Sequence, residues 1–294
     1  QGLSVSVQGV GPRVFGSSSA DLRIDVGNSG TTLFLATALS ALRTGKTRFD
    51  GDASIRTRSA GPLLHALTDL GATVSFEGTP DHAPFTITGP LVGGKTAIEC
   101  PTSQYLSALL LAAPLIYGDH DAGPPGTVSE SSDESAGAYA RGTTTDSELT
   151  TTVEVPLLYE RPYVDMTLSW LDNQGIAYQR KEYARFSVPG GQSFQPFHRA
   201  LEGDWSSATF WLVAGAAGLG DVTVSGLDPS DVQGDRAVLD ILAALGASVD
   251  WTHTNGTSAC TVTGPLTRGG RFDLNAIPDA LPALAVAGCF SGNT

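Results

Sequence analysis

The sequence contains few cysteines, few lysines and no long uninterrupted apolar run. Among its 294 residues are 3 cysteines, Cys100, Cys260 and Cys289, and their odd number and wide spacing fit neither a disulfide framework nor a metal site of the CxxC type. We expect all three to be buried as small hydrophobic side chains. No stretch reaches the roughly 18 consecutive apolar residues of a membrane-spanning helix. The 5 histidines show no spacing with acidic residues or cysteines that would form a metal site, and we expect no metal.

Positive charge is also scarce. Asp and Glu number 30 against 17 Lys and Arg, which gives a formal net charge of -13. Binding to nucleic acid or to an anionic membrane surface depends on Lys and Arg side chains that replace counterions. The sequence therefore predicts small-molecule or protein partners, with no nucleic acid and no membrane. Residues 1–10 alternate as a strand does and do not resemble a signal peptide, so we expect a cytoplasmic location.

An internal repeat indicates how the chain is organised. The copies lie at residues 63–91, 238–266 and, more weakly, 166–188. In the first two copies, one part reads x-Leu-x-x-Leu-x-x-Leu-Gly-Ala-x-Val and a later part reads Thr-x-Thr-Gly-Pro-Leu. Leucines at helical spacing predict a helix with one buried face, and the glycine after them ends it. The alternating β-branched residues that follow predict two strands joined by a turn.

A second type of helix is predicted by four segments that are rich in Ala and Leu and apolar nearly all round, at residues 31–42, 103–115, 206–219 and 279–290. Helices of this kind are deeply buried. Together with the repeats, they predict an α/β fold with helices inside and sheets outside. Residues 118–152 interrupt the pattern, because they are rich in Gly, Ser, Thr, Asp and Glu and almost lack large apolar side chains. We expect them to form a flexible acidic insertion at the surface.

Several helix starts carry residues that suit an anionic ligand. Residues 27–32 read Gly-Asn-Ser-Gly-Thr-Thr, where glycines allow close approach and the free amides of a helix start attract an anion. Arg56 and Arg58 precede another helix, and an arginine fork suits carboxylate or phosphate. Residues 101–104 and Asp279 also stand at helix starts. Turn formation, helix capping and solvated arginines explain the same residues, and on these residues alone both interpretations stay open.

Six segments in sequence resemble 5-enolpyruvylshikimate-3-phosphate synthases, also called 3-phosphoshikimate 1-carboxyvinyltransferases, of the enolpyruvyl transferase family. They are Gly-Asn-Ser-Gly-Thr at 27–31, Arg-Thr-Arg-Ser at 56–59, Thr-Ser-Gln-Tyr-Leu-Ser-Ala-Leu at 102–109, Arg-Pro-Tyr-Val-Asp-Met-Thr-Leu at 161–168, Glu-Gly-Asp-Trp-Ser-Ser-Ala at 202–208 and Ile-Pro-Asp-Ala at 277–280. The resemblance implies a two-domain enolpyruvyl transferase fold, an inside-out α/β barrel of repeated helix-and-sheet units that is incomplete here. We expect a first domain over residues 1–200 that lacks its N-terminal unit and carries the insertion at about 118–152. A truncated second domain would occupy residues 201–294.

The resemblance also implies an activity. The enolpyruvyl group of phosphoenolpyruvate would be transferred to the 5-hydroxyl of shikimate 3-phosphate, with release of phosphate, in aromatic amino acid biosynthesis. The matching positions are Gly30, Arg58 and Gln104 for phosphoenolpyruvate, and Thr102, Ser103, Gln104 and Tyr163 for shikimate 3-phosphate. Asp279 matches the carboxylate that engages the hydroxyl and assists proton transfer. The resemblance implies no cofactor and no metal, and we expect a monomer.

Some positions depart from the family's pattern. Phe34 stands where the family usually has an arginine, Ser59 replaces a proline, and Glu160 stands where many relatives have a serine that contacts the phosphorylated substrate. Family segments with further substrate-binding residues are missing at both ends, so we expect this chain alone to have little or no activity. Two alternatives stay open. They are a UDP-N-acetylglucosamine enolpyruvyl transferase, whose reactive cysteine loop has no counterpart here, and a degenerate protein that binds a ligand without catalysis.

Overall fold

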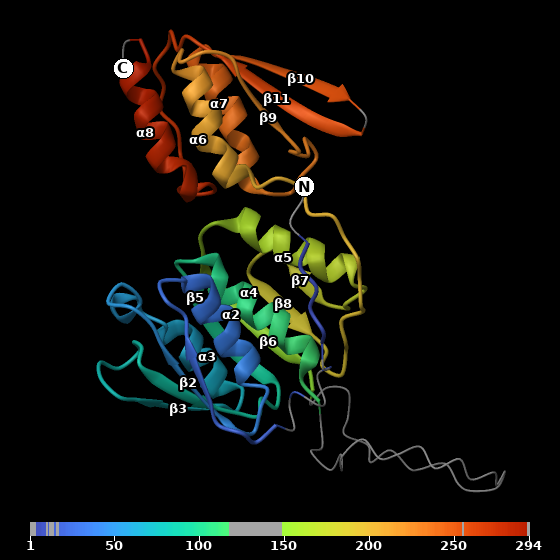
Figure 1. Cartoon of the computed structure of the whole chain (residues 1–294). Helices are drawn as coiled ribbons and strands as arrows, with labels where there is room; N and C mark the ends of the chain where they lie inside the picture. The colour runs from blue at the N-terminus through green and yellow to red at the C-terminus, as the bar shows by residue number, and fades with distance from the viewer. Residues whose placement is uncertain are drawn as a thin grey trace, which may run out of the picture. The chain divides into compact units, whose positions relative to one another are not determined.

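Two compact units make up the chain. The computed structural model describes residues 4–9, 11, 15, 18–117, 149–254 and 256–292 (Figure 1). Unit 1 comprises Gln1–Leu157 and Leu171–Phe194, and unit 2 comprises Leu158–Trp170 and Gln195–Thr294. Within the described ranges, no helix is long and apolar enough to cross a membrane.

Three repeats of helix and sheet build most of the fold, as the repeated sequence predicts. Each repeat contains a buried helix, a strand, a second helix and a hairpin of two strands. Repeat 1 comprises α2 (Gly30–Ser40), β2 (Lys46–Asp50), α3 (Gly61–Asp69), β3 (Thr73–Phe76) and β4 (Phe85–Thr88). Repeat 2 comprises α4 (Ser103–Ala112), β6 (Thr151–Leu158), α5 (Arg161–Asn173), β7 (Gln179–Lys181) and β8 (Arg185–Val188). Repeat 3 comprises α6 (Trp205–Ala216), β9 (Val222–Ser225), α7 (Val238–Leu245), β10 (Ser248–Thr254) and β11 (Thr257–Thr263).

The remaining elements precede or follow these repeats or join their parts. Strands β1 (Leu22–Asp25) and β5 (Gly94–Cys100) come before the first two buried helices, and α8 (Leu281–Phe290) follows the third repeat. The short 3-10 helices are η1 (Ile55–Thr57), η2 (Ala113–Leu115), η3 (Gly234–Ala237) and η4 (Pro278–Ala280). Three of them, η1, η3 and η4, lie at or beside the candidate functional residues.

The three sheets share one strand order. Within the repeats the orders are β2-β4-β3, β6-β8-β7 and β9-β11-β10. In the first sheet β1 pairs with β2 in parallel, and in the second β5 lies beside β6. The hairpin strands of every repeat are antiparallel. Each hairpin thus folds back so that its second strand lies next to the strand that follows the buried helix.

The helices that open repeats 1 and 2 form the centre of unit 1. Helices α2 and α4 lie side by side (Figure 1), and Leu33, Leu106 and Leu109 are at most 1% exposed. In α4, Gln104 and Leu111 alone are not fully buried. The apolar composition of α4 therefore predicted its burial correctly, since a helix that is apolar all round has no face suited to water.

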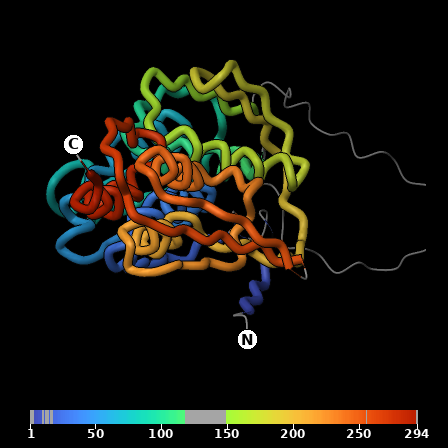
Figure 2. Tube along the Cα trace, turned by 90° about the horizontal axis from the view of Figure 1, so that it is seen from above, coloured from blue at the N-terminus to red at the C-terminus, as the bar shows by residue number. Residues whose placement is uncertain are grey.

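Unit 2 has a smaller core, and here one prediction is wrong. Figure 2 shows α6, α7 and α8 nearly end-on, with α6 packed against both neighbours. Residues 279–290 were expected to be a buried helix, but α8 buries Ala283 and Ala287 and leaves Leu281, Val286 and Phe290 at least 50% exposed. Because α8 packs mainly against α6, its outer face has no cover within the described chain.

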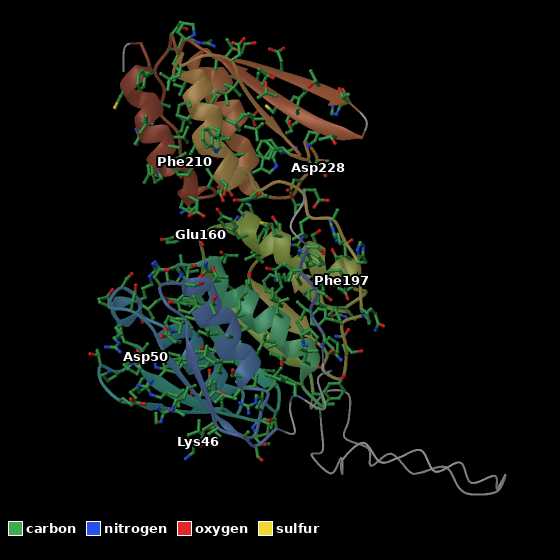
Figure 3. All side chains as sticks on the ribbon, in the orientation of Figure 1. Lys46, Asp50, Glu160, Phe197, Phe210 and Asp228 are labelled. Carbon is green, nitrogen blue, oxygen red and sulfur yellow. The ribbon has the colours of Figure 1, made fainter. Side chains whose placement is uncertain are left out.

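The exposed side of unit 2 affects two further expectations. Phe210, which Figure 3 shows on α6, is 52% exposed although α6 was expected to be deeply buried. Cys289 on α8 is exposed, whereas Cys100 and Cys260 are buried as predicted. The composition of a helix indicates that a face is apolar, but it does not show which other element covers that face.

A glycine after the last strand of each repeat lies against a carbonyl group near the end of the buried helix. The pairs are Gly89 with Ala41, Gly190 with Ile116, and Gly264 with Ala216. A Cβ at Gly190 would lie 2.5 Å from the Ile116 oxygen, and a Cβ at either other glycine would overlap its carbonyl oxygen. The repeated glycine therefore permits close approach between the sheet and the helix beneath it.

Two expectations concern the chain outside these repeats. The predicted insertion at 118–152 lies outside the described residues up to 148, and its last two residues already belong to β6. Residues 4–9 have no regular secondary structure, although residues 1–10 alternate as a strand does. A strand needs a paired neighbour to be stable, and no described strand pairs with this segment.

Candidate functional site

The first group of candidate residues lies in unit 1 at the start of α2. Ser29 caps this helix, with its Oγ accepting a hydrogen bond of 3.1 Å from the Thr32 amide. A Cβ at Gly30 would lie 2.8 Å from Arg58 Nη1 and 3.7 Å from Gln104 Oε1. The structure thus brings together Gly30, Arg58 and Gln104, which are far apart in sequence. We call these three residues the Arg58 cluster.

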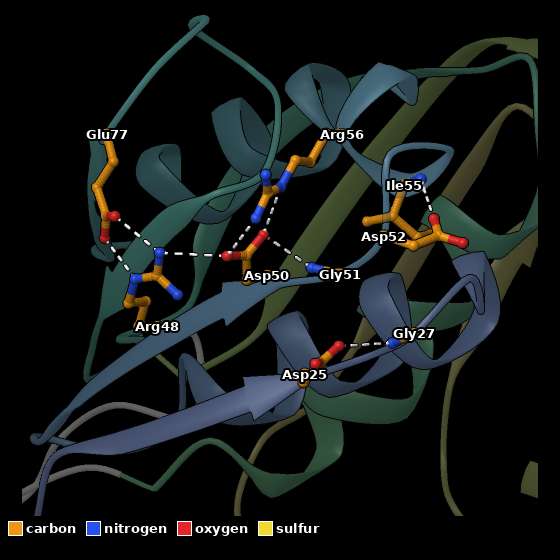
Figure 4. Close-up of polar contacts among 9 residues, drawn as sticks. All are labelled: Asp25, Gly27, Arg48, Asp50, Gly51, Asp52, Ile55, Arg56 and Glu77. Atoms are coloured by element: carbon orange, nitrogen blue, oxygen red, sulfur yellow. Dashed lines mark hydrogen bonds and ion pairs between the residues drawn. The ribbon is translucent and has the colours of Figure 1, made fainter.

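The two neighbouring arginines have different surroundings. Arg56 donates to both carboxylate oxygens of Asp50, at 2.9 and 3.0 Å (Figure 4). The Arg58 side chain has no hydrogen-bond or ion-pair partner among the residues that the structure describes. An unpaired guanidinium beside a helix start suits a carboxylate or phosphate. Of the two arginines that the sequence offered, Arg58 is the one available to a ligand.

An ion network holds Arg56 in place. Arg48 donates to Glu77 at 2.6 and 2.8 Å and also lies 3.3 Å from Asp50 (Figure 4). The hydrogen bond from Arg56 lowers the pKa of Asp50, and the Gly51 amide and Arg48 lower it further, although burial opposes the shift. Asp50 therefore stays ionised and keeps Arg56 away from the Arg58 cluster.

Aspartates also shape the two loops that carry Gly30 and Arg58. Asp25 Oδ1 accepts a hydrogen bond of 2.9 Å from the Gly27 amide, and Asp52 Oδ1 accepts one of 2.9 Å from the Ile55 amide (Figure 4). The loops are joined directly, because the Asp52 amide donates to the Gly27 carbonyl at 2.8 Å. The approach of Arg58 to Gly30 is thus fixed by backbone contacts as well as by side chains.

The start of α4 completes this region. Thr102 is the N-cap and accepts from the Gln104 amide at 3.4 Å, while the Gln104 side chain donates to Thr31 Oγ1 at 2.9 Å. Ser103 is 1% exposed, so its hydroxyl does not face solvent. Tyr105 Oη donates to the Ser59 carbonyl at 2.6 Å, which links α4 to the loop of Arg58.

Phe34 belongs to the core beneath the Arg58 cluster. Its ring is 4% exposed and packs edge-on against Tyr105, with 4.8 Å between ring centroids. Burial raises the pKa of Tyr105 to about 12. The position where the family usually has an arginine is therefore filled by an aromatic pair that carries no charge at neutral pH.

The second group of candidate residues lies in unit 2. The Tyr163 hydroxyl at the start of α5 is 3.0 Å from Asp235 Oδ2 in η3 and 3.3 Å from Asp279 Oδ2 in η4. Burial raises the pKa of Tyr163, and the charges of Asp235 and Asp279 raise it further. We call these three residues the Tyr163 triad. It presents one carboxylate, that of Asp279, to solvent.

The structure thus places the predicted site residues in two groups, one in each unit. Thr102 and Ser103 adjoin the Arg58 cluster, while Tyr163 and Asp279 belong to the Tyr163 triad. Asp235 was missed, and the available signal was the Gln-Gly-Asp sequence just before the repeat helix α7. Among the residues described, no three His, Cys, Asp or Glu side chains gather as a metal site would require.

Comparisons with known proteins identify the family of this chain. The family model described as EPSP synthase (3-phosphoshikimate 1-carboxyvinyltransferase) matches residues 4–122 and 137–294. A 3-phosphoshikimate 1-carboxyvinyltransferase of Ruminiclostridium cellulolyticum is 41% identical over 268 residues, covering 91% of this chain and 55% of that protein. One from Halobacterium salinarum is 37% identical over 288 residues, covering 95% and 59%. The chain spans little more than half the length of these curated relatives.

Solved structures share the fold. EPSP synthase from Acinetobacter baumannii has a TM-score of 0.60 and 23% identity, covering 90% of this chain and 53% of that one. The enolpyruvyl transferase NikO from Streptomyces tendae has a TM-score of 0.52 and 16% identity, covering 88% and 54%. The predicted α/β enolpyruvyl transferase fold is confirmed. The matched family model and the repeated architecture lead to one conclusion: this chain belongs to the EPSP synthase (3-phosphoshikimate 1-carboxyvinyltransferase) family.

Proposed function

We propose that this chain provides part of the site of an enzyme that transfers the enolpyruvyl group of phosphoenolpyruvate to the 5-hydroxyl of shikimate 3-phosphate and releases phosphate. The observation that carries the proposal is the Arg58 guanidinium, which lies beside Gly30 and Gln104 and has no partner within the described ranges. Both substrates are anionic, and such ligands are bound by arginine forks and by the free amides of helix starts. The names of the reported curated relatives do not favour the UDP-N-acetylglucosamine alternative.

Within this proposal, the two groups have different tasks. Arg58, Gly30 and Gln104 bind phosphoenolpyruvate. Addition of a hydroxyl to its double bond needs one group that accepts the hydroxyl proton and another that supplies a proton to carbon. The exposed Asp279 carboxylate is the acceptor that we assign, and Tyr163 holds one of its oxygens. Thr102, Gln104 and Tyr163 contact shikimate 3-phosphate, whereas Ser103, which is 1% exposed, supports the start of α4 beneath them.

The proposal also covers the organisation of the protein. We propose two domains, over residues 1–200 and 201–294. The division of compact units at residue 195 supports a boundary in this region, and the second unit also includes Leu158–Trp170. We further propose a monomer that works in the cytoplasm. Because the chain spans 55% of the Ruminiclostridium relative, we expect the isolated chain to bind ligand but to have little or no turnover.

The test is a set of calorimetric titrations with phosphoenolpyruvate, shikimate 3-phosphate and UDP-N-acetylglucosamine. We expect the first two to bind, and we expect Arg58→Met to weaken phosphoenolpyruvate binding at least tenfold. Arg185→Met is the matched control, because Arg185 in unit 1 pairs with Glu154 at the surface and lies outside the proposed site. Equal phosphoenolpyruvate affinity in all three proteins would contradict the proposal, as would binding of UDP-N-acetylglucosamine alone.

A further inference from the structure

The Tyr163 hydroxyl lies between two carboxyl oxygens, and this arrangement determines how many protons the three groups must share. Tyr163 Oη is 3.0 Å from Asp235 Oδ2 and 3.3 Å from Asp279 Oδ2. A phenol has one hydrogen, so it donates to one carboxyl oxygen at a time. If both carboxyls were ionised, the other close contact would bring two oxygen lone pairs together. Two hydrogen bonds in this row of three oxygens need two protons.

The surroundings of the two carboxyls differ. Asp235 is 0% exposed, and its Oδ1 has no hydrogen-bond partner among the described residues. An unpartnered buried oxygen costs much less free energy on a neutral acid than on an ionised carboxylate. Asp279 is exposed to solvent, where water stabilises its charge. The second proton therefore belongs on Asp235.

The charged groups that face Asp235 act in the same direction. Burial raises the pKa of Asp235, and the charges of Asp279 in η4 and Asp204 at the start of α6 raise it further. Hydrogen bonds that Tyr163 and the Asp235 backbone amide would donate to an ionised Asp235 oppose this shift without reversing it. Arg236, the next residue, donates to the Pro229 carbonyl.

Asp204 provides an internal contrast. Its carboxylate accepts hydrogen bonds from the amides and hydroxyls of Ser206 and Ser207 and from Gln233 Nε2. Burial raises the pKa of Asp204, but these hydrogen bonds outweigh burial and lower it to about 2. A buried aspartate with such donors stays ionised. Asp235 lies 31 positions later in the chain, and the described residues offer it no such set of side-chain donors.

Backbone packing holds the row of oxygens together. A Cβ at Gly234 would lie 2.5 Å from Pro162 Cβ, so η3 and the start of α5 are in direct contact. Asp235 and Tyr163 are the residues that follow these two positions. Their separation is therefore set by close contact between two short segments of unit 2.

We propose that Asp235 is a positioning residue: its carboxyl keeps a proton, donates it in a hydrogen bond to the Tyr163 oxygen, and thereby directs the Tyr163 hydrogen at Asp279. Tyr163 then donates to Asp279 Oδ2 and stabilises that carboxylate in one orientation. The use of this orientation in enolpyruvyl transfer rests on the proposed function. The placement of the protons does not, and it is testable without any substrate.

The test is infrared spectroscopy of the 294-residue chain at pH 7, because a protonated carboxylic acid and an ionised carboxylate absorb separately. Asp235→Asn keeps the shape of the side chain and an N–H donor to Tyr163, and it removes only the acid. We expect the spectrum of the unmodified chain minus that of Asp235→Asn to contain the acid band. Asp204→Asn is the control for an ionised aspartate: its difference spectrum should contain the loss of carboxylate absorption, and the acid band should remain in the variant, because burial is the main cause of the raised pKa of Asp235.

Tyr163→Phe tests the hydrogen bond itself. Loss of the acceptor oxygen should move the acid band to higher frequency, as for a carboxylic acid without a partner. Isotopic labelling of aspartate shifts the band in the unmodified chain and identifies it even if Asp235→Asn does not fold. Absence of an aspartic acid band at pH 7, or a band that Tyr163→Phe does not move, would overturn the proposal. Because no ligand is used, this outcome is independent of whether phosphoenolpyruvate binds.

Discussion

Gly30 and Arg58 are so close that a Cβ at Gly30 would lie 2.8 Å from Arg58 Nη1. The arginine end is flexible and can move, so Gly30→Ala should fold normally while displacing the guanidinium. We expect phosphoenolpyruvate binding to weaken about tenfold, or ~1.4 kcal/mol, with little change in melting temperature. Gly78→Ala is the control, because a Cβ there meets nothing within 4 Å. An unchanged affinity for phosphoenolpyruvate in Gly30→Ala would contradict the assignment of Arg58 to phosphoenolpyruvate binding.

Gly264→Ala should destabilise unit 2. Its Cβ would overlap the Ala216 carbonyl oxygen at the end of α6, and a backbone group cannot yield as a side chain does. Overpacking of this kind costs about 1–3 kcal/mol. Gly288→Ala in the exposed part of α8 meets nothing within 4 Å and should gain about 0.5–1 kcal/mol from helix propensity. The urea concentration at the midpoint of unfolding should therefore fall in Gly264→Ala and rise in Gly288→Ala. A shift of both midpoints in the same direction would contradict the close contact at Gly264.

Arg43 is a buried cation that is held by neutral acceptors. It is 1% exposed and donates to Thr47 Oγ1 at 2.8 Å, to Ser18 Oγ at 3.2 Å and to the Ala20 carbonyl at 2.5 Å. Arg43→Met leaves these acceptors without a donor, and we expect a loss of about 3 kcal/mol in the free energy of unfolding. The exposed Arg185→Met should change stability little. A similar small effect in both variants would show that water replaces the guanidinium.

Asp204 should make stability depend on pH in acid. Burial raises its pKa, but the hydrogen bonds from Ser207, Gln233 and Ser206 lower it to about 2 in the folded chain, against about 3.9 when unfolded. A lowered folded pKa means that the stabilisation is present above pH ~4 and is lost as the pH falls towards 2. Asp204→Asn keeps an N-cap side chain but should lack this loss. If the melting temperatures of the two proteins fell by the same amount between pH 4 and pH 2, the assignment would be contradicted.

The three cysteines should differ in reactivity. Burial raises the pKa of Cys100 to about 12 and that of Cys260 to about 11, and the thiolate is the reactive form. Cys289 is exposed on α8. A thiol reagent should therefore modify one cysteine quickly in the folded chain and all three after unfolding. Cys289→Ser should abolish the fast reaction, and a fast reaction that survives would place another thiol at the surface.

The repeats were predictable because their signals are local. Leucine spacing and Leu-Gly-Ala located α3 and α7 to within one or two residues, and the Gly-Pro pairs marked the ends of β4 and β11. The exposure of α8 was not predictable, since the sequence of a helix rich in Ala and Leu does not show whether a neighbouring element covers it. The fold class and the order of elements thus follow from sequence, while the burial of one element depends on all the others.

The candidate site was predictable only in part, because its geometry depends on distant residues. Arg56 and Arg58 are equivalent in sequence, but Asp50 pairs with Arg56, and no described residue pairs with the Arg58 side chain. Asp235 contacts Tyr163 across 72 positions, and its protonation depends on burial that no local pattern reports. Residue types and family resemblance identified the candidates, whereas the structure distinguishes those that are paired from those that are free.

The glycines at 89, 190 and 264 restrict the register in which each hairpin can pair. Each one lies against a carbonyl at the end of the buried helix of its own repeat or shortly after it, so a hairpin that slid by two residues would bring a larger side chain to that point. The slid arrangement would preserve the inward and outward faces of the strand, and the hydrophobic pattern alone would tolerate it. The glycine excludes the slid arrangement, because a larger side chain does not fit against the carbonyl. Each glycine therefore fixes the register of its hairpin relative to the helix of the same repeat.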